Sequence, residues 1–310
     1  MATFRRSLLV FIITFLVCSL LFGVIALLVV PKVNDLLGFA DSVERGVTDD
    51  GSGELIETGT VVGGKGGLTA LFVGVDQVPG VTTGKSVSAD TIIFLTVSES
   101  KKAFVYVSLP CRMEVVVDGE TMFLGNVYGR KGIQYLAERV TGLTGVAVNY
   151  YAVVTIEGMK KLIDGMGGIE VSVPVNMRYK DESQDLEIDI TRGYQKLDGE
   201  QAVNMLRYRG DSFRERGTRN LDFLKMLVRE FTASDRKAEA ADVLLRLSDD
   251  VETNFTEKDL LKYLDLIWSY SEYDEISLEY PGKYTTNDDG YTIYRPKTDS
   301  AYAMIAEYKN

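Results

Sequence analysis

Residues 68–76, LTALFVGVD, form a short apolar run that ends in an aspartate, and periodic structure in the chain begins there. The run is rich in β-branched and aromatic residues, which is typical of a buried strand. Two runs of the same kind follow after turn-rich segments, DTIIFLTVS at residues 90–98 and AFVYVSLP at residues 103–110. The sequence therefore predicts three buried strands in this part of the chain.

Further along the chain, segments with helical spacing alternate with strand-like segments, and this implies an α/β or α+β sandwich. We expect helices at residues 128–142, 157–168, 199–209 and 218–232, and strands at residues 149–155 and 169–175. Residues 236–272 look helical, with a capping box at TEKD, and EISLEYP and YTIYRP predict strands on either side of NDDG. No repeat or linker follows residue 68, so residues 68–310 are expected to form one domain.

The N-terminal part carries a long apolar run. Residues 8–30, LLVFIITFLVCSLLFGVIALLVV, contain no charge and are long enough to cross about 30 Å of hydrocarbon as a helix. Arginines precede the run, whereas one lysine and one aspartate follow it and cancel. By the positive-inside rule, residues 1–31 are expected to comprise a cytoplasmic N-terminus and a transmembrane helix. Residues 32–67, polar and glycine-rich, would then be an extracellular linker.

Two other interpretations of this segment are weaker. A cleaved signal peptide has an apolar region of about 7–15 residues and a small-residue cleavage site, and the run here is longer and is followed by no strong site of that kind. A lipoprotein would use Cys18, which follows the unsuitable residues Leu16 and Val17. We therefore expect a single-pass cell-membrane protein whose C-terminal domain lies outside the cell and whose partners include the lipid bilayer.

Composition excludes several classes of function. The formal net charge of −11 makes nucleic acid an improbable partner, because phosphate backbones are bound by dominantly basic faces. The chain has no histidine, which excludes a Ser-His-Asp triad and the usual histidine-bearing zinc sites. Its two cysteines, Cys18 and Cys111, fall on the two sides of the expected membrane boundary, so the exterior domain is expected to lack an internal disulfide.

Two aspartates border the first two predicted strands. Asp76 ends one and Asp90 opens the next, so the two carboxylates meet at one sheet edge if these strands are neighbours. Such a pair suits Mg²⁺, which takes one or two carboxylates and fills its shell with water and substrate phosphate. The alternative is turn or capping chemistry, since aspartate is common in turns and often borders strands.

A second cluster is basic. Five arginines, Arg207, Arg209, Arg214, Arg216 and Arg219, lie within LRYRGDSFRERGTRN at residues 206–220, offset by Asp211 and Glu215. The stretch is expected to be the loop between two helices together with their adjoining ends. Guanidinium groups bind phosphate bidentately, and packed like charges repel unless an anion joins them. We favour an anion site, and the alternative is a solvated helix face with internal pairs to the two acids.

A phosphate loop is a further candidate that fails. LFVGVDQVPGVTTGKS at residues 71–86 has a glycine, a lysine and a serine after a strand. However, Pro79 stands where the first glycine of the motif belongs, and a strand rather than a helix follows. The helix N-terminus that would bind the anion is therefore missing.

The order of these motifs resembles the LytR-CpsA-Psr family of membrane-anchored bacterial phosphotransferases. The resemblance begins with one N-terminal span and continues through LFVGVD, ADTIIFLTV, VYVSLP and YYAVVTIEGMKKLIDGMGGIEVSVP, and its most specific parts are LDGEQAVNMLRYR and RERGTRNLDFLK. It implies a three-layer α/β/α sandwich with a central mixed sheet and a hydrophobic pocket for a lipid tail. It also implies transfer of a glycopolymer, such as teichoic acid or capsular polysaccharide, from a polyprenyl-diphosphate lipid to peptidoglycan.

Carried over by position, the resemblance assigns roles to individual residues. Asp76 and Asp90 match the family's magnesium-associated aspartates. The resemblance implies catalytic roles for Asp90, Arg207 and Arg209. It also implies contacts to the diphosphate by Arg207, Arg209, Arg216, Arg219 and Asn220.

The sequence departs from the family pattern at places that matter for charge. Ser88 and Cys111 stand where the family has arginines, and Asn220 and Leu221 replace a pair of glutamines. Lys85 and Arg112 are candidate substitutes, although adjacent strand residues point to opposite faces. Two hypotheses follow: a divergent glycopolymer transferase, or a non-catalytic member that binds a polyprenyl-phosphate lipid or an anionic wall polymer.

Overall fold

The structure is a computed structural model that describes residues 67–76, 87–182, 186–233 and 250–308. All of these belong to one compact unit, residues 58–310. The predicted transmembrane segment, nearly all of the linker, and Lys85 lie outside the described residues. Among the described helices, none is both long and apolar enough to cross a bilayer.

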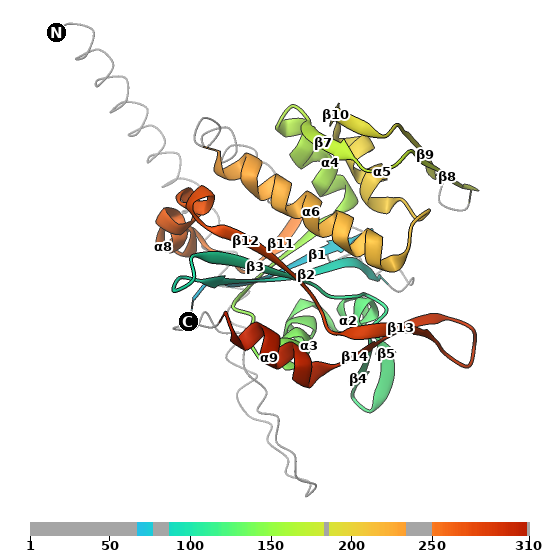
Figure 1. Cartoon of the computed structure of the whole chain (residues 1–310), viewed down its shortest axis with the longest axis vertical. Helices are drawn as coiled ribbons and strands as arrows, with labels where there is room; N and C mark the ends of the chain where they lie inside the picture. The colour runs from blue at the N-terminus through green and yellow to red at the C-terminus, as the bar shows by residue number, and fades with distance from the viewer. Residues whose placement is uncertain (1–66, 77–86, 183–185, 234–249, 309–310) are drawn as a thin grey trace, which may run out of the picture. The chain divides into compact units, whose positions relative to one another are not determined.

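A six-stranded mixed sheet forms the centre of the fold (Figure 1). Its strand order is β11-β6-β1-β2-β3-β12, with β1 parallel to β6, β3 parallel to β12 and the remaining neighbours antiparallel. The strands are β1 (Thr69–Val75), β2 (Ala89–Ser98), β3 (Ala103–Ser108), β6 (Tyr150–Thr155), β11 (Val251–Thr253) and β12 (Asp274–Glu279). The central mixed sheet that the resemblance implied is confirmed.

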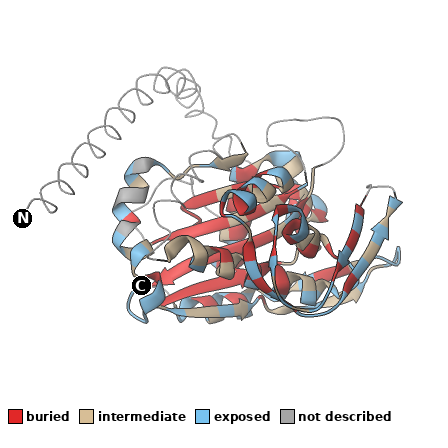
Figure 2. Cartoon of the chain, turned by 90° about the horizontal axis from the view of Figure 1, so that it is seen from above, coloured by how far each residue is buried: buried red, intermediate tan, exposed pale blue. Residues whose placement is uncertain are grey.

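Helices cover both faces of this sheet, which explains why β1 is an almost continuous apolar run. Leu71 and Val73 pack on one side against a core that includes Leu136 and Ile305. Ala70 packs on the other side with Leu221. The first helical layer comprises α2 (Leu124–Lys131), α3 (Ile133–Thr144) and α9 (Thr298–Ala306), and the second comprises α6 (Phe213–Thr232) and α8 (Glu257–Trp268). Figure 2 shows the sheet buried along most of its length.

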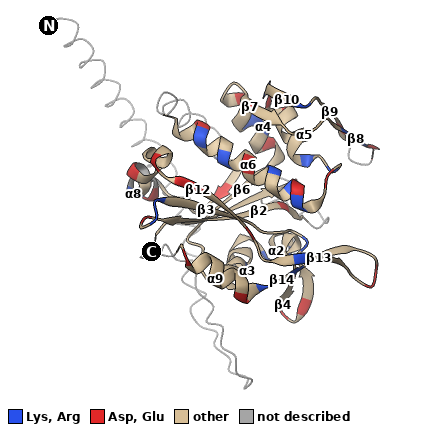
Figure 3. Ribbon diagram, viewed as in Figure 1, with Lys and Arg blue, Asp and Glu red and all other residues tan. Residues whose placement is uncertain are grey.

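A second core lies on the far side of α6. It is built by α4 (Ile156–Gly165) and α5 (Gly199–Arg207) with two small two-stranded sheets. In one, β7 (Ile169–Val173) pairs with β10 (Gly193–Leu197), and in the other, β8 (Met177–Asp181) pairs with β9 (Leu186–Ile190) as a hairpin. Phe223 and Leu227 of α6 pack into this core. Helix α6 therefore packs on the central sheet with one face and into this second core with another. It also carries several lysines and arginines along its length (Figure 3).

Two further hairpins and a short helix complete the domain. Strand β4 (Glu114–Val117) pairs with β5 (Glu120–Phe123), and β13 (Gly282–Thr286) pairs with β14 (Thr292–Pro296) around the NDDG turn, while a 3₁₀ turn spans Tyr270–Glu272. Met113 forms a bridge with Tyr294, and the backbone N–H of Tyr294 donates to the carbonyl of Arg112 at 2.9 Å. The C-terminal hairpin is thereby joined to the segment that follows β3.

Several boundaries differ from the sequence predictions for local reasons. The helix expected at residues 128–142 is two helices, because Gly132 has φ of +85° and breaks the chain direction. The helix expected from residue 218 begins at Phe213, because Ser212 and Glu215 form a capping box. Within the stretch expected to be helical at residues 236–272, residues 251–253 form strand β11, whereas the capping box at Thr256 and Asp259 is confirmed.

The glycines of helices α2 and α3 allow a matched test of packing. A Cβ at Gly129 would lie 1.8 Å from the carbonyl oxygen of Val87, whereas one at Gly142 would meet nothing within 4 Å. We expect Gly129→Ala to lower the free energy of unfolding by about 1–3 kcal/mol. Gly142→Ala is expected to raise it by about 0.5–1 kcal/mol, because alanine is the better helix former.

Urea denaturation of the two variants checks this prediction. Equal stability of the two variants would show that α2 does not press on the segment that enters β2.

Candidate anion-binding site at the edge of the sheet

The two predicted aspartates come together at one edge of the sheet. Strands β1 and β2 are antiparallel neighbours, with Val75 opposite Ala89 and a register shift between Gly74 and Val75. Asp76 directly follows β1, and Asp90 is the second residue of β2. The sequence predicted that Asp76 and Asp90 would meet at one sheet edge if their strands were neighbours, and the strands are neighbours.

Part of Asp90 is exposed to solvent, but protein atoms surround its carboxyl group on the other sides. The resulting loss of solvation raises the pKa of this carboxyl group above its usual value. Arg216, Arg209 and Arg207 act in the opposite direction, and the charge of Asp76 adds to the rise. The carboxylates of Asp76 and Asp90 thus repel each other when both are charged.

The arginine stretch is divided between two helices and a short connection. Helix α5 ends at Arg207, and α6 begins at Phe213 after residues 208–212. The carboxylate of Glu215 accepts hydrogen bonds from the backbone N–H and the hydroxyl of Ser212, at 2.9 and 2.8 Å. Glu215 is therefore used to cap α6 rather than to neutralise an arginine.

Arg219 serves the fold. Its guanidinium is buried, with 8% of the residue exposed, forms an ion pair with Asp211, and donates to the carbonyl of Tyr208 at 2.8 Å. Burial lowers the pKa of this group to about 10. The alternative of an internal pair is thus correct for Arg219, and the structure gives it no position in the cavities described next.

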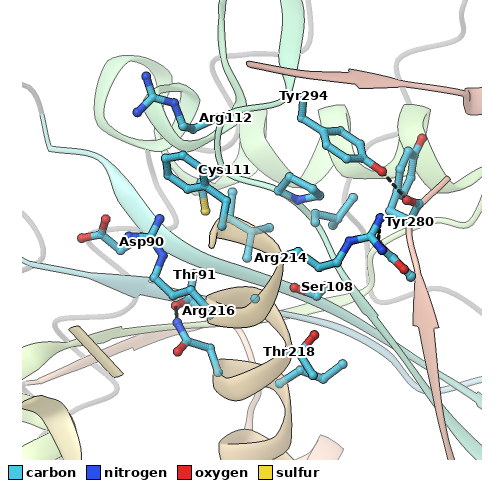
Figure 4. Close-up of a pocket in the computed structure, with 18 of the residues that line it drawn as sticks. Asp90, Thr91, Ser108, Cys111, Arg112, Arg214, Arg216, Thr218, Tyr280 and Tyr294 are labelled. Atoms are coloured by element: carbon cyan, nitrogen blue, oxygen red, sulfur yellow. Dashed lines mark hydrogen bonds and ion pairs between the residues drawn. The ribbon is translucent and has the colours of Figure 1, made fainter. Parts of the chain in front are cut away.

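Two cavities meet at Asp90. The more polar one has a volume of about 430 Å³ and lies between β2, α2 and the start of α6; its lining includes Ser88, Asp90, Arg112, Asn126, Arg209, Phe213 and Arg216. The more apolar one, of about 240 Å³, extends under α6 toward β12 and the C-terminal hairpin; its lining includes Asp90, Leu109, Asn220, Leu278, Tyr284 and Tyr294. Figure 4 shows Asp90, Cys111 and Arg216 at one end of the apolar cavity and Tyr280 and Tyr294 at the other.

The other predicted residues occupy distinct places. Arg209 and Arg216 line the polar cavity and have no ion-pair partner among the described residues. Arg207 lines neither cavity, and its terminal nitrogen is 3.6 Å from a carboxylate oxygen of Asp76. Asn220 lines the apolar cavity and donates to the hydroxyl of Thr91 at 2.7 Å, which ties α6 to β2.

Ser88 and Cys111, at the positions where the resemblance implies arginines, lie on the wall of the polar cavity. Both approach Gly125 at the start of α2, where an added Cβ would be 3.1 Å from the Ser88 hydroxyl oxygen and 3.2 Å from the Cys111 Cβ. Burial raises the pKa of the Cys111 thiol to about 12, so the thiol is neutral and is not a nucleophile at neutral pH. Small side chains are accommodated at both positions.

Phe213 is the functional candidate that the sequence analysis missed. It lines both cavities, and its ring lies within 5.3 Å of two guanidinium carbons. The available signal was an aromatic residue placed between arginines in DSFRER, since arginine is attracted to aromatic faces.

Magnesium fits the pair of aspartates in kind. Asp90 lines the arginine-lined cavity, whereas Asp76 lies at the same sheet edge and lines neither cavity. Mg²⁺ binds one or two carboxylates and completes its shell with water and phosphate, so these residues suit it by type. Within the part of the chain that the structure describes, no cluster of three or more metal-binding side chains occurs.

The fold and the site together define a class, that of α/β sandwich proteins with an arginine-lined cavity at the edge of the sheet. Residues 45–310 match the model of the LytR_cpsA_psr family, and the chain belongs to that family.

Among similar proteins, the polyisoprenyl-teichoic acid–peptidoglycan teichoic acid transferase TagV of Bacillus subtilis is 26% identical over 195 residues, covering 60% of this chain and 49% of the relative. The match thus spans about half the length of that relative. A transferase of the same description, TagU of Enterococcus faecalis, is 25% identical and covers 78% of this chain and 79% of the relative.

Solved structures agree on the fold. The crystal structure of B. subtilis TagV superposes with a TM-score of 0.66 at 21% identity, covering 79% of this chain and 98% of that one. A structure described as TagT bound to LI-WTA superposes with a TM-score of 0.62 at 17% identity, covering 86% and 94%.

The buried ion pair predicts strong coupling between its partners. Removing one partner leaves the other charge buried, so we expect Arg219→Met and Asp211→Asn each to lower the free energy of unfolding by about 3–5 kcal/mol. The double variant should lose clearly less than the sum of the two. Chemical denaturation of the three variants measures this, and additive losses would show that the two groups act independently.

The raised pKa of Asp90 predicts a pH-dependent effect on stability. The native state holds this proton more tightly than the unfolded chain, so the carboxylate lowers stability as the pH rises through the native pKa. We therefore expect Asp90→Asn to raise the Tm at neutral pH and to have little effect below the pKa of the unfolded carboxyl. Thermal scans of both proteins across this range test the sign, and a gain that does not change with pH would contradict it.

Proposed function

We propose that this protein is a membrane-anchored extracellular phosphotransferase that moves a glycopolymer from a polyprenyl-diphosphate lipid to peptidoglycan during cell wall assembly. The observation that carries this proposal is the meeting of an arginine-lined polar cavity and an apolar cavity at Asp90. Membership of the family and the transferase descriptions of TagV and TagU support the same reaction. Residues 8–30 would supply the anchor.

The polar cavity suits a diphosphate by its charge. Its ionisable lining comprises Arg112, Arg209, Arg216, Asp90 and Asp211, and Asp211 is already paired with Arg219. Three arginines therefore face one uncommitted carboxylate. Guanidinium groups bind phosphate oxygens bidentately and keep their charge, so the cavity has the excess of positive charge that a diphosphate diester requires.

The apolar cavity suits the beginning of a hydrocarbon chain. Leu109, Leu278 and the rings of Tyr280 and Tyr294 line it, and it opens onto the same Asp90 and Arg216 as the polar cavity. A lipid diphosphate has this arrangement of parts, with an apolar chain joined directly to an anionic head. We therefore place the first isoprene units beneath α6 and the diphosphate beside Arg209 and Arg216.

The reaction forms one bond and breaks one. A hydroxyl of peptidoglycan attacks the phosphorus that carries the glycopolymer, a new phosphodiester forms, and the bond to the polyprenyl phosphate breaks. The hydroxyl proton leaves with the departing phosphate or is taken up by solvent. Arg209 and Arg216 stabilise the charge on the phosphoryl group, which is the main source of catalysis in phosphoryl transfer.

Two carboxylates complete the proposed site. Asp90 lines both cavities and has no ion pair among the described residues, which supports a role for it in orienting the acceptor hydroxyl. Asp76 and Asp90 would together hold Mg²⁺, which supplies further positive charge to the phosphate oxygens when bound. Arg207, paired with Asp76, positions that carboxylate.

A second candidate is a non-catalytic member that binds a polyprenyl-phosphate lipid or an anionic wall polymer. The observation that favours it is the presence of Ser88 and Cys111 on the wall of the polar cavity, where the family has arginines. The two candidates differ in turnover rather than in binding.

Activity of the full chain in detergent separates them. With a polyprenyl-diphosphate disaccharide, Mg²⁺ and peptidoglycan fragments, release of polyprenyl phosphate is the readout. We expect Arg209→Gln and Arg216→Gln each to lower kcat about a hundredfold or more, because each removes a charged donor to the transferring group. Arg178→Gln, an exposed arginine paired with Asp189, is the control and should leave kcat unchanged.

Binding of the lipid without release of polyprenyl phosphate by the unmodified chain would establish the non-catalytic candidate instead. Absence of both binding and release would contradict both.

A further inference from the structure

We propose that Arg112 and Arg216, held on the ring of Phe213, form a paired guanidinium clamp for one phosphate of the lipid diphosphate, and that Phe213 is its positioning residue. The inference rests on the proposed function and names how this particular chain binds the phosphate. Its starting point is a geometry that neither the family match nor the relatives' descriptions assign.

The ring of Phe213 lies close to two positive charges. The guanidinium carbon of Arg112 is 5.2 Å from the ring centroid, and that of Arg216 is 5.3 Å from it. Both distances are within the roughly 6 Å range of a cation–π interaction. The two arginines come from different parts of the fold, Arg112 from the segment after β3 and Arg216 from the first turn of α6.

The position of this ring is fixed on several sides. Phe213 is the first residue of α6, and the capping box of Ser212 and Glu215 sets the start of that helix. The ring of Tyr284 stacks against it, with the centroids 6.0 Å apart and the planes 21° from parallel. The ring of Phe213 is half-buried, and these two contacts restrain it.

Arg112 is oriented so that part of its guanidinium remains available. Its Nε donates to the carbonyl of Thr292 at 2.7 Å, and its guanidinium carbon is also 5.1 Å from the ring centroid of Phe123. Among the described residues, its two terminal nitrogens have no hydrogen-bond partner. Arg112 lines both cavities, so these nitrogens are available for an anion.

Electrostatics indicate what the clamp binds. Neither Arg112 nor Arg216 has an ion pair in the part of the chain that the structure describes, and two like charges on one ring repel. A cation–π contact offsets part of this repulsion, and an anion that bridges both groups removes it. The clamp thus supplies positive charge beside the positions where Ser88 and Cys111 leave none.

Binding of geranylgeranyl diphosphate to the full chain in detergent tests the clamp, with inorganic pyrophosphate as the headgroup alone. Arg112→Gln is expected to weaken binding of the lipid diphosphate about tenfold or more, since it removes a charged hydrogen-bond donor. Arg178→Gln removes the same charge from an exposed hairpin and should have no effect.

The Phe213 variants test the positioning role. Phe213→Leu keeps an apolar side chain but removes the aromatic face, and we expect it to weaken binding about three- to tenfold. Phe213→Tyr keeps the face and should bind within about twofold of the unmodified chain. Because Phe213 acts partly through Arg112, the double variant Arg112→Gln/Phe213→Leu should lose less than the product of the two single losses.

Three outcomes overturn the inference. If Arg112→Gln binds the lipid diphosphate as Arg178→Gln does, Arg112 is not a ligand, and the proposed function is unaffected. If Phe213→Leu and Phe213→Tyr bind equally well, the ring does not position the pair, and this comparison also decides the matter should Arg112→Gln fail to fold. If the unmodified chain binds neither probe, the proposed function fails and the clamp fails with it.

Discussion

The buried ion pair between Arg219 and Asp211 is the constraint on which the site depends. It joins the first half of α6 to the connection that leaves α5, and the bond from Arg219 to the carbonyl of Tyr208 strengthens the same link. With this connection fixed, Arg209 and Arg216 lie on the wall of one cavity although they come from opposite sides of a turn. The ion pair between Arg219 and Asp211 therefore helps to position Arg209 and Arg216 on the cavity wall.

The strands and the sheet edge were predictable because their signals are local. Apolar runs such as LTALFVGVD are typical of buried strands, and the two aspartates lie directly at the strand ends, where neighbouring strands bring them together. The separate places of Arg207, Arg209, Arg216 and Arg219 were not predictable in the same way. Arg219 and Arg216 are three residues apart in one helix, yet one is buried in an ion pair and the other faces a cavity. Which of them is buried depends on the position of Asp211, and that is a matter of tertiary packing.

Arg112, which follows the third strand, illustrates a second limit of prediction from the sequence. By alternation along a strand, Arg112 would point away from the direction of Cys111. However, β3 ends at Ser108, so the rule of alternation does not apply at residues 111 and 112. Beyond the strand, Arg112 turns toward the rings of Phe123 and Phe213. Cys111 and Arg112 therefore both line the polar cavity. The polar cavity therefore keeps an excess of positive charge although Ser88 and Cys111 lie on its wall.

The link between Arg112 and strand β14 has a consequence for the order of synthesis. The Nε of Arg112 donates to the carbonyl of Thr292, and the backbone of Tyr294 donates to the carbonyl of Arg112. Residues 292–294 follow almost all other parts of the site along the chain, so they are made last. A nascent chain can pair β1 with β2 and cap α6 well before the C-terminal hairpin exists, but it cannot yet hold Arg112. Arg112 thus takes its position in the cavity only when the domain is nearly complete.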